Sequence, residues 1–397
     1  MQRLVSRSCS HNHPCQGATF AASIQIQATV DRLVDLAVKG LPPMFDRGRK
    51  LFCEKLKKTD RGLIQEGLSQ RYTMMALLGL HRYGEAGGTS FLSSAAVLDT
   101  LFADLSWIQD IGDLGLLLWL CGVAAPGRLA KLGEQLPIAN ALSTYPSAKT
   151  EATMELAWFL TGLAYWGSAF PKQRPELEGL ALATYGRLKG NQGKRGFFGH
   201  LCTSSSWRGM ARGRIGSFAD QVYPIYAMTQ FARAFGYEEA GCRALSCARA
   251  ICAAQGALGQ WWWHYDSLGG EVVEGYPVFS VHQHAMGPMA LFALGEATAE
   301  DFVPWIYRGL QWVNGKNELK VNMEDDNAKL IWRCQFRRRS RLMKYFSFAI
   351  ASGEGEFQAA EDLEVLYECR PYELGWLLYA LAARAEQKPE VVGEIKI

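Results

Sequence analysis

Three consecutive tryptophans precede a histidine, a tyrosine and an aspartate in the segment GQWWWHYDSLGG, residues 259–270. Three adjacent indoles cannot all face one core, so we expect some of them to line a surface or cleft. A flat indole stacks on the apolar face of a pyranose, and its quadrupole also stabilises a cation. Tryptophans that only plug one end of the fold are the alternative. The predicted binding residues here are Trp261, Trp262, Trp263, Tyr265 and Asp266, with His264 as an acid–base candidate.

Two histidines stand two residues apart in EGYPVFSVHQHAMGPMA, residues 274–290. Residues with this spacing do not share a helix face, and no further Cys/His spacing accompanies them, so we predict no metal site. On an extended segment, with His264 or Asp266 nearby, a zinc site is the alternative. Imidazole titrates near neutrality, which suits acid–base work or a substrate hydrogen bond. Histidines satisfied inside a core are the alternative. His282 is predicted to be catalytic, and Tyr276 and His284 are predicted to bind substrate.

The segment GRIGSFADQVYPIYAM, residues 213–228, places Asp220 and Gln221 at the expected start of a buried helix. An aspartate there is often only an N-cap. In a ring of helices, however, the starts of the inner helices open onto the central cavity. We therefore predict Asp220 as a catalytic group, with Gln221 and Tyr223 in contact with the substrate.

Charged and aromatic residues also crowd the helix start in ECRPYELGWLLYAL, residues 368–381. The planar fork of Arg370 could hold a carboxylate or phosphate. Glu373 is the second predicted catalytic carboxylate, although it could instead pair with Arg370 in a purely structural role. Tyr372 lies beside Pro371, just as Tyr223 and Tyr276 each precede a proline, and this recurrence indicates one common rim.

Paired carboxylates are what glycoside hydrolysis requires, one as acid and one as base or nucleophile. Asp220 with Glu373 is the predicted pair, and Asp113 in WIQDIGDLGL, residues 107–116, is a further candidate at the site. Epimerisation would instead need acid–base groups on opposite faces of the sugar, where His282 or His284 could serve. These residues are compatible with both hydrolysis and isomerisation of a sugar.

The elements that must position these residues are helices of two alternating kinds. Segments that are apolar on nearly all faces predict buried helices, and segments with polar residues along one side predict half-exposed ones. An inner ring of helices inside an outer ring satisfies this alternation, because no single pair can bury its own apolar face. The buried segments are 71–84, 110–122, 153–167, 220–236, 281–295 and 370–384, and the amphipathic ones include 23–40, 175–190, 237–256 and 299–313.

Three long insertions, residues 190–219, 256–280 and 313–369, precede the last three buried helices. Long loops tend to carry function, so we place the active face there. No Pro/Ser-rich linker divides the chain. We predict one domain over 23–397, preceded by a flexible N-terminal tail over 1–22.

This alternation resembles the six-hairpin (α/α)6 toroid superfamily, which includes glycoside hydrolases, unsaturated uronyl hydrolases, sugar epimerases and polysaccharide lyases. The resemblance covers most of the chain and rests on architecture. It implies an all-α toroid and an enzyme that hydrolyses or isomerises a sugar unit. Terpene cyclases and prenyltransferases share the layout, so an isoprenoid-type enzyme is the alternative, although MEDDNAKL (323–330) matches neither of their acidic motifs. A non-catalytic helical scaffold is disfavoured by the polar groups at buried helix starts.

The composition of the chain bears on which partners and which cell compartment we expect. Hydrophobic residues make up 49% of the 397 residues and the net charge is only +3, which argues against nucleic acid as a partner. No stretch is long and apolar enough to span a bilayer, and no secretory signal is evident. Ten scattered cysteines favour a reducing compartment, so we expect a cytoplasmic protein. No phosphate loop or dinucleotide fingerprint is present, so we predict a small-molecule substrate, a saccharide, and no cofactor.

Overall fold

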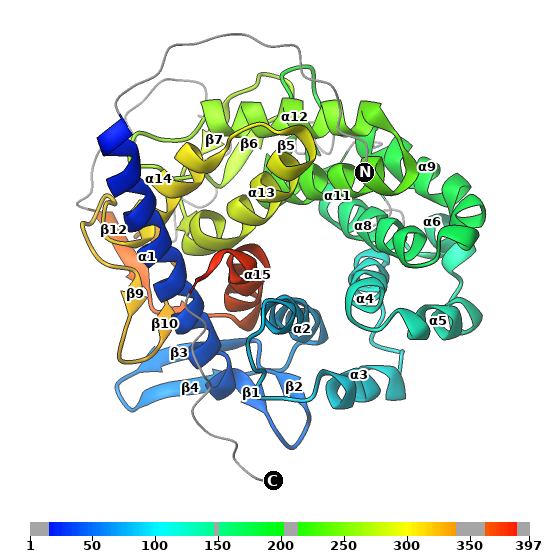
Figure 1. The fold of residues 1–397 in the computed structure, drawn as a ribbon, viewed down its shortest axis with the longest axis horizontal. Coiled ribbons are helices and arrows are strands. Elements are labelled where there is room, and N and C mark those ends of the chain that lie inside the picture. Colours follow the sequence, from blue (N-terminus) through cyan, green and yellow to red (C-terminus); the bar gives the residue numbers. More distant parts are fainter. Residues whose placement is uncertain (1–15, 147–150, 202–212, 339–361, 387–397) are drawn as a thin grey trace.

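The computed structural model describes residues 16–146, 151–201, 213–338 and 362–386. Within these ranges, six helices form a closed inner ring in which each contacts the next and the last contacts the first (Figure 1). All six correspond to the segments predicted as buried. In chain order the inner helices are α2 (Gln70–Glu85), α4 (Ile111–Ala124), α8 (Thr153–Ala169), α11 (Ala219–Phe235), α13 (Gly287–Thr298) and α15 (Pro371–Leu381).

A second set of helices packs outside this ring. Most of them directly follow their inner partner in the chain, whereas α15 is covered by α1, the first helix of the described chain. Figure 1 shows α1 in blue beside α15 in red, so the two ends of the chain close the ring together. The outer helices are α1 (Gln16–Gly40), α3 (Ser94–Ala103), α5 (Leu129–Gln135), α9 (Arg174–Gly190), α12 (Glu238–Ala253) and α14 (Val303–Val313), with the short α6 (Ala141–Thr144) after α5.

The inner helices are buried because they have neighbours on every side. Every residue of α4 from Ile111 to Cys121 is buried, which explains why that segment is apolar apart from Asp113. The predicted alternation of buried and half-exposed helices is therefore confirmed. Helix α1 begins at Gln16, earlier than the predicted start at residue 23, while most of the predicted tail lies outside the described residues.

The long insertions contain small antiparallel sheets, and each is followed by the start of an inner helix. Strand β5 leads into α11, β8 leads into a π-helical turn (His282–Met286) before α13, and β13 leads into α15. The sheets therefore lie at the N-terminal end of the inner ring. The strands are β1 (Phe45–Asp46), β2 (Leu51–Phe52), β3 (Lys55–Thr59), β4 (Gly62–Glu66), β5 (Ile215–Ser217), β6 (His264–Asp266), β7 (Val272–Glu274), β8 (Val278–Phe279), β9 (Glu324–Asp325), β10 (Leu330–Ile331), β11 (Cys334–Arg337), β12 (Leu363–Leu366) and β13 (Glu368–Cys369).

Glycines let the inner helices touch backbone to backbone. A Cβ atom on Gly79 of α2 would lie 2.1 Å from the carbonyl oxygen of Gly375 in α15. On α4, a Cβ on Gly115 would lie 2.4 Å from the backbone nitrogen of Phe159 in α8. The ring thus depends on these positions having no side chain.

We expect Gly79→Ala to lower the free energy of unfolding by about 1–3 kcal/mol, because overpacking outweighs the better helix propensity of alanine. Gly84→Ala in the same helix is the control, since a Cβ there meets nothing within 4 Å. Denaturant unfolding of both variants tests this. Equal stability of the two variants would contradict the close approach of α2 and α15.

Candidate active site

The starts of α2 and α4 are joined by an arginine between two carboxylates. Arg71 donates from Nε to Asp113 at 2.5 Å and from Nη2 to Asp110 at 2.7 Å. Asp110 also caps α4, since its Oδ1 accepts from the backbone N–H groups of Gly112 at 2.9 Å and Asp113 at 3.1 Å. On α8, Glu155 is 1% exposed, and a Cβ on Gly112 would lie 2.8 Å from its Cγ. The guanidinium of α2 is thus surrounded by two carboxylates from the start of α4 and one from α8.

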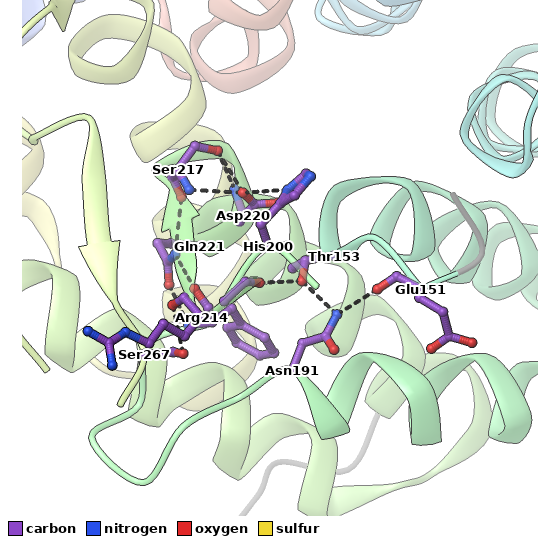
Figure 2. Close-up of polar contacts among 11 residues, drawn as sticks. Glu151, Thr153, Asn191, His200, Arg214, Ser217, Asp220, Gln221 and Ser267 are labelled. Carbon is purple, nitrogen blue, oxygen red and sulfur yellow. Dashed lines mark hydrogen bonds and ion pairs between the residues drawn. The ribbon is translucent and has the colours of Figure 1, made fainter. Parts of the chain in front are cut away.

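The start of α11 carries a second acidic centre. Asp220 is 2% exposed, and its Oδ2 accepts hydrogen bonds from the backbone N–H and the hydroxyl of Ser217, both at 2.9 Å. The Nδ1 atom of His200 lies 3.3 Å from the same oxygen. Figure 2 shows Ser217 and His200 converging on Asp220 from two sides. The carboxylate predicted as catalytic therefore holds an imidazole.

A second histidine–carboxylate pair lies on the neighbouring strands. His264 in β6 is cross-strand neighbour to Ser217 in β5 and to Glu274 in β7. Its Nδ1 lies 3.0 Å from the carboxylate of Glu274, and its ring stacks on Trp263 with centroids 4.3 Å apart. The pairing of β5 with β6 therefore places two histidine–carboxylate pairs at one sheet.

The start of α15 is held by a buried ion-pair cluster. Arg333, at the end of the loop before β11, donates to Glu373 at 2.5 Å and lies 3.3 Å from Glu368. Glu373 also accepts from the backbone N–H of Arg370 at 3.2 Å, and burial raises its pKa above the usual range. Glu373 thus makes the contacts of a structural ion pair, the alternative considered above, but its partner is Arg333 rather than Arg370. The guanidinium of Arg370 donates to the hydroxyl of Tyr72 at 2.8 Å instead.

Aromatic rings from several inner helices pack against one another in tilted and edge-on contacts. Near the helix starts, Tyr223 packs against Trp158 with centroids 5.2 Å apart and against Trp376 at 6.1 Å. Tyr72 and Tyr372 pack together at 4.7 Å. These rings are contributed by α2, α8, α11 and α15, so aromatic side chains connect the first two turns of four inner helices.

The opposite end of the inner ring holds a network of phenol groups. The hydroxyls of Tyr165, Tyr226 and Tyr379 form a triangle with sides of 2.6, 3.0 and 2.7 Å. The indole N–H of Trp119 donates to Tyr379 at 3.2 Å, and Arg82 donates to Tyr165 at 3.4 Å. Burial raises the pKa of Tyr226 well above the usual value, so this phenol stays neutral.

Several predicted binding residues prove to be packing residues. Trp261 is fully buried and stacks on Phe218 with centroids 5.5 Å apart, so the prediction that it lines a surface is wrong. The indole N–H of Trp262, 9% exposed, donates to Ala254 O at 3.0 Å. Trp263 is the half-buried tryptophan of the three. The predicted alternative of tryptophans that plug the fold therefore applies to the first two.

Other predicted contacts are also occupied by neighbouring protein groups. Tyr265 and Gln221 are fully buried, and Gln221 bonds the backbone of Phe198 through both ends of its amide at 2.8 and 2.9 Å. Tyr276 donates to Glu318 at 2.7 Å. Asp266 caps its own loop by accepting from Leu268 N–H at 2.9 Å. These four side chains fix the loops before α11 and α13.

The two histidines of the π-helical turn are also inside the protein. His284 is 0% exposed, which rules out the predicted contact with a substrate, and burial lowers its pKa to about 3. His282 is 6% exposed and packs against Phe218 at 4.6 Å, and burial together with the charge of Arg333 lowers its pKa to about 3. Both imidazoles are therefore neutral near pH 7 and are poor proton acceptors, which weighs against the catalytic role predicted for His282.

Four residues that contact or lie at these helix starts were not predicted as site residues. Arg71 and Glu155 lie at the beginning of buried helical segments, so their charge inside an apolar pattern was the available signal. His200 and Arg333 lie in segments that were treated only as insertions. In the described parts of the chain, no group of three or more His, Cys, Asp or Glu side chains is arranged to hold a metal ion.

No family model and no curated protein matches the chain. Among solved structures, a sugar epimerase from a ruminal bacterium matches 91% of this chain and 100% of its own, with a TM-score of 0.59 and 10% identity. A possible GH105 member from Salmonella enterica matches 89% and 93%, with a TM-score of 0.58 and 12% identity. An unsaturated glucuronyl hydrolase specific for heparin matches 90% and 97%, with a TM-score of 0.55 and 14% identity.

The chain has the (α/α)6 toroid fold. The closed inner ring and the near-complete coverage of these structures agree on this point, as the alternation of helices predicted. At 10–14% identity the likeness extends to the fold alone. Among the described helices of this toroid, none has the length and apolar character needed to cross a membrane.

Proposed function

We propose that this toroid is a carbohydrate-active enzyme that works on a sugar unit by carboxylate and histidine acid–base catalysis. The observation that carries the proposal is the gathering of Asp113, Glu155 and Asp220 at the starts of three consecutive inner helices. Removing three acids from water costs desolvation free energy, which is more readily explained by a site than by a scaffold. The named activities of the similar structures, glucuronyl hydrolysis and sugar epimerisation, are the first reactions to test.

Hydrolysis is supported by carboxylates on helices that are not neighbours. Asp113 belongs to α4 and Asp220 to α11, with α8 between them, so a sugar lying over α8 would have an acid on each side. An acid and a base that flank the scissile bond are what both retaining and inverting hydrolysis use. The half-buried rings of Tyr72, Tyr372 and Trp263 would pack against the sugar.

Isomerisation is the second candidate, and the two histidine–carboxylate pairs support it. An imidazole backed by a carboxylate takes and returns a proton near neutral pH, as removal of a proton from a sugar carbon requires. His200 with Asp220 and His264 with Glu274 supply two such groups.

The isoprenoid alternative gains little support from the acidic segment MEDDN. Glu324 is 6% exposed and is ion-paired with Arg32 of α1. Asp325 accepts from the backbone N–H groups of Asn327 at 3.1 Å and Ala328 at 2.9 Å, within the turn between β9 and β10. These two acids therefore stabilise a hairpin against the outer helix rather than face the ring axis.

We expect Asp220→Asn to lower turnover by at least 100-fold, because either reaction loses its buried charge at the start of α11. The assay would follow sugar release from oligosaccharides with saturated and unsaturated uronyl ends, and epimerisation of free sugars and disaccharides. Asp46→Asn is the control, because Asp46 lies in the β1–β2 hairpin and its hydrogen bonds are to Gly48 and Arg49 of the same hairpin. Unchanged turnover in Asp220→Asn would remove this residue from the mechanism.

A further inference from the structure

The geometry points to His200 as the group that exchanges the proton with the substrate, with Asp220 as the residue that positions it. This inference deepens the proposed function and rests on it. His200 stands in the segment GFFGH, residues 196–200, which enters the site from the loop after α9. The exposed imidazole of His200 and the buried carboxylate of Asp220 thus have separate roles.

Burial separates the two roles. Asp220 is 2% exposed, and its Oδ2 already accepts from the N–H and the hydroxyl of Ser217 at 2.9 Å each. The side chain of His200 is 44% exposed, although its Nδ1 lies 3.3 Å from that same oxygen. A substrate can therefore reach the imidazole far more easily than the carboxylate. In Figure 2, Asp220 lies between Ser217 and His200.

The backbone of His200 is fixed between two inner helices. Its carbonyl accepts from the N–H of Thr153, the first residue of α8, at 3.0 Å. The hydroxyl of Thr153 donates to Gly199 O at 2.5 Å and accepts from Asn191 at 2.8 Å. On the other side, Gln221 of α11 bonds the backbone of Phe198. The segment that carries the imidazole is thus held at the junction of α8 and α11, and the ring itself lies beside Asp220 (Figure 2).

The hydrogen bond to Asp220 selects the tautomer. A carboxylate accepts only, so Nδ1 of His200 carries the proton and the lone pair stays on Nε2. Nε2 then takes a proton from a water molecule or a sugar hydroxyl, and the electron pair of the broken O–H bond stays on that oxygen. The imidazolium formed is stabilised by the charge of Asp220, and it returns the proton to the leaving oxygen or to water.

The other histidines at this end are less suited to this task. His284 is fully buried and His282 is 6% exposed. His264 is 25% exposed at its side chain and lies against Glu274 and Trp263. His200 is the most exposed of the four while still held by a buried acid. This combination is what a proton-transfer group requires, because it must be both reachable and fixed.

The test compares His200→Ala with His81→Ala, in which the replaced histidine lies near the far end of α2, half-buried. We expect His200→Ala to lower kcat at least 100-fold with less than a threefold change in KM, and added imidazole to restore part of the rate. His81→Ala should keep the wild-type rate and show no response to imidazole. Full activity in His200→Ala, or a loss that imidazole does not restore, would overturn the assignment.

A second measurement needs no substrate. In protein with ¹⁵N-labelled histidine, the nitrogen chemical shifts of His200 should report the Nδ1–H tautomer, and Asp220→Asn should shift the population toward Nε2–H. An unchanged tautomer in Asp220→Asn would refute the positioning role. If the wild-type chain acts on no sugar, the proposed function fails while the tautomer result stands. If it does act and His200→Ala is fully active, only this inference fails.

Discussion

Replacing Arg71 by methionine should lower the free energy of unfolding by about 3 kcal/mol, because it leaves two buried carboxylates without their cation. The side chains of Asp110 and Asp113 are 10% and 7% exposed, and both are bonded to this guanidinium. Arg71 itself is 28% exposed, which places the expected loss at the lower end of the range for buried pairs. Denaturant unfolding near pH 7 measures it.

The cause can be separated from lost packing by a compensating change. Asp110→Asn with Asp113→Asn in the Arg71→Met background removes the unpaired charges, and asparagine still caps a helix, so most of the loss should be recovered. Arg49→Met is the matched control, since its pair with Asp46 is 3.3 Å long and Arg49 is 72% exposed. A triple variant no more stable than Arg71→Met would show that the charges are not the cause.

Acid should unfold this protein steeply because two neutral histidines are buried together in the π-helical turn. Burial lowers the pKa of His282 and His284 to about 3, whereas the unfolded chain binds those protons near pH 6.5. Above pH 6.5 both states are neutral and the stability is fully present. As the pH falls from 6.5 toward 3, only the unfolded state takes up protons, so stability is lost. Each histidine contributes a slope of up to about 1.4 kcal/mol per pH unit.

Unfolding curves at several pH values between 7 and 4 test this expectation. His284→Gln should reduce the number of protons taken up on unfolding by about one, and so reduce the slope of the unfolding free energy against pH, whatever its effect on stability at pH 7. His81→Gln is the control, since this histidine is half-buried near the end of α2. If the slope of His284→Gln equals that of the wild type, the neutral state of this imidazole is not what makes the fold sensitive to acid.

The fold was predictable because the inner helices have no polar face. A segment such as α4, with Ile111 to Cys121 all buried, is apolar at every position except Asp113, and that pattern is visible in the sequence. The strands were not predictable in the same way. Strands such as β8 and β13 are only two residues long, and they are specified by partners far along the chain, such as Cys334 opposite Phe279.

The site was predicted unevenly for a related reason. Asp220 and Asp113 stand at helix starts, where local sequence signals their position, and both lie at the expected end of the ring. Trp261 and His284 have side chains typical of a binding site, but tertiary packing buries them. The partners that define the site, Arg71 for Asp113 and His200 for Asp220, are 42 and 20 residues away in the chain. Such pairs depend on the closed ring and leave no local pattern.

The closure of the ring between α1 and α15 has a consequence for synthesis. Until residues 371–381 leave the ribosome, α2 and α13 lack the helix that lies between them, and α1 lacks the helix it covers. Apolar surface that α15 later buries, such as the partners of Trp376 and Leu377, stays open to water and to other chains. The growing polypeptide is therefore expected to need chaperones until α15 has been translated.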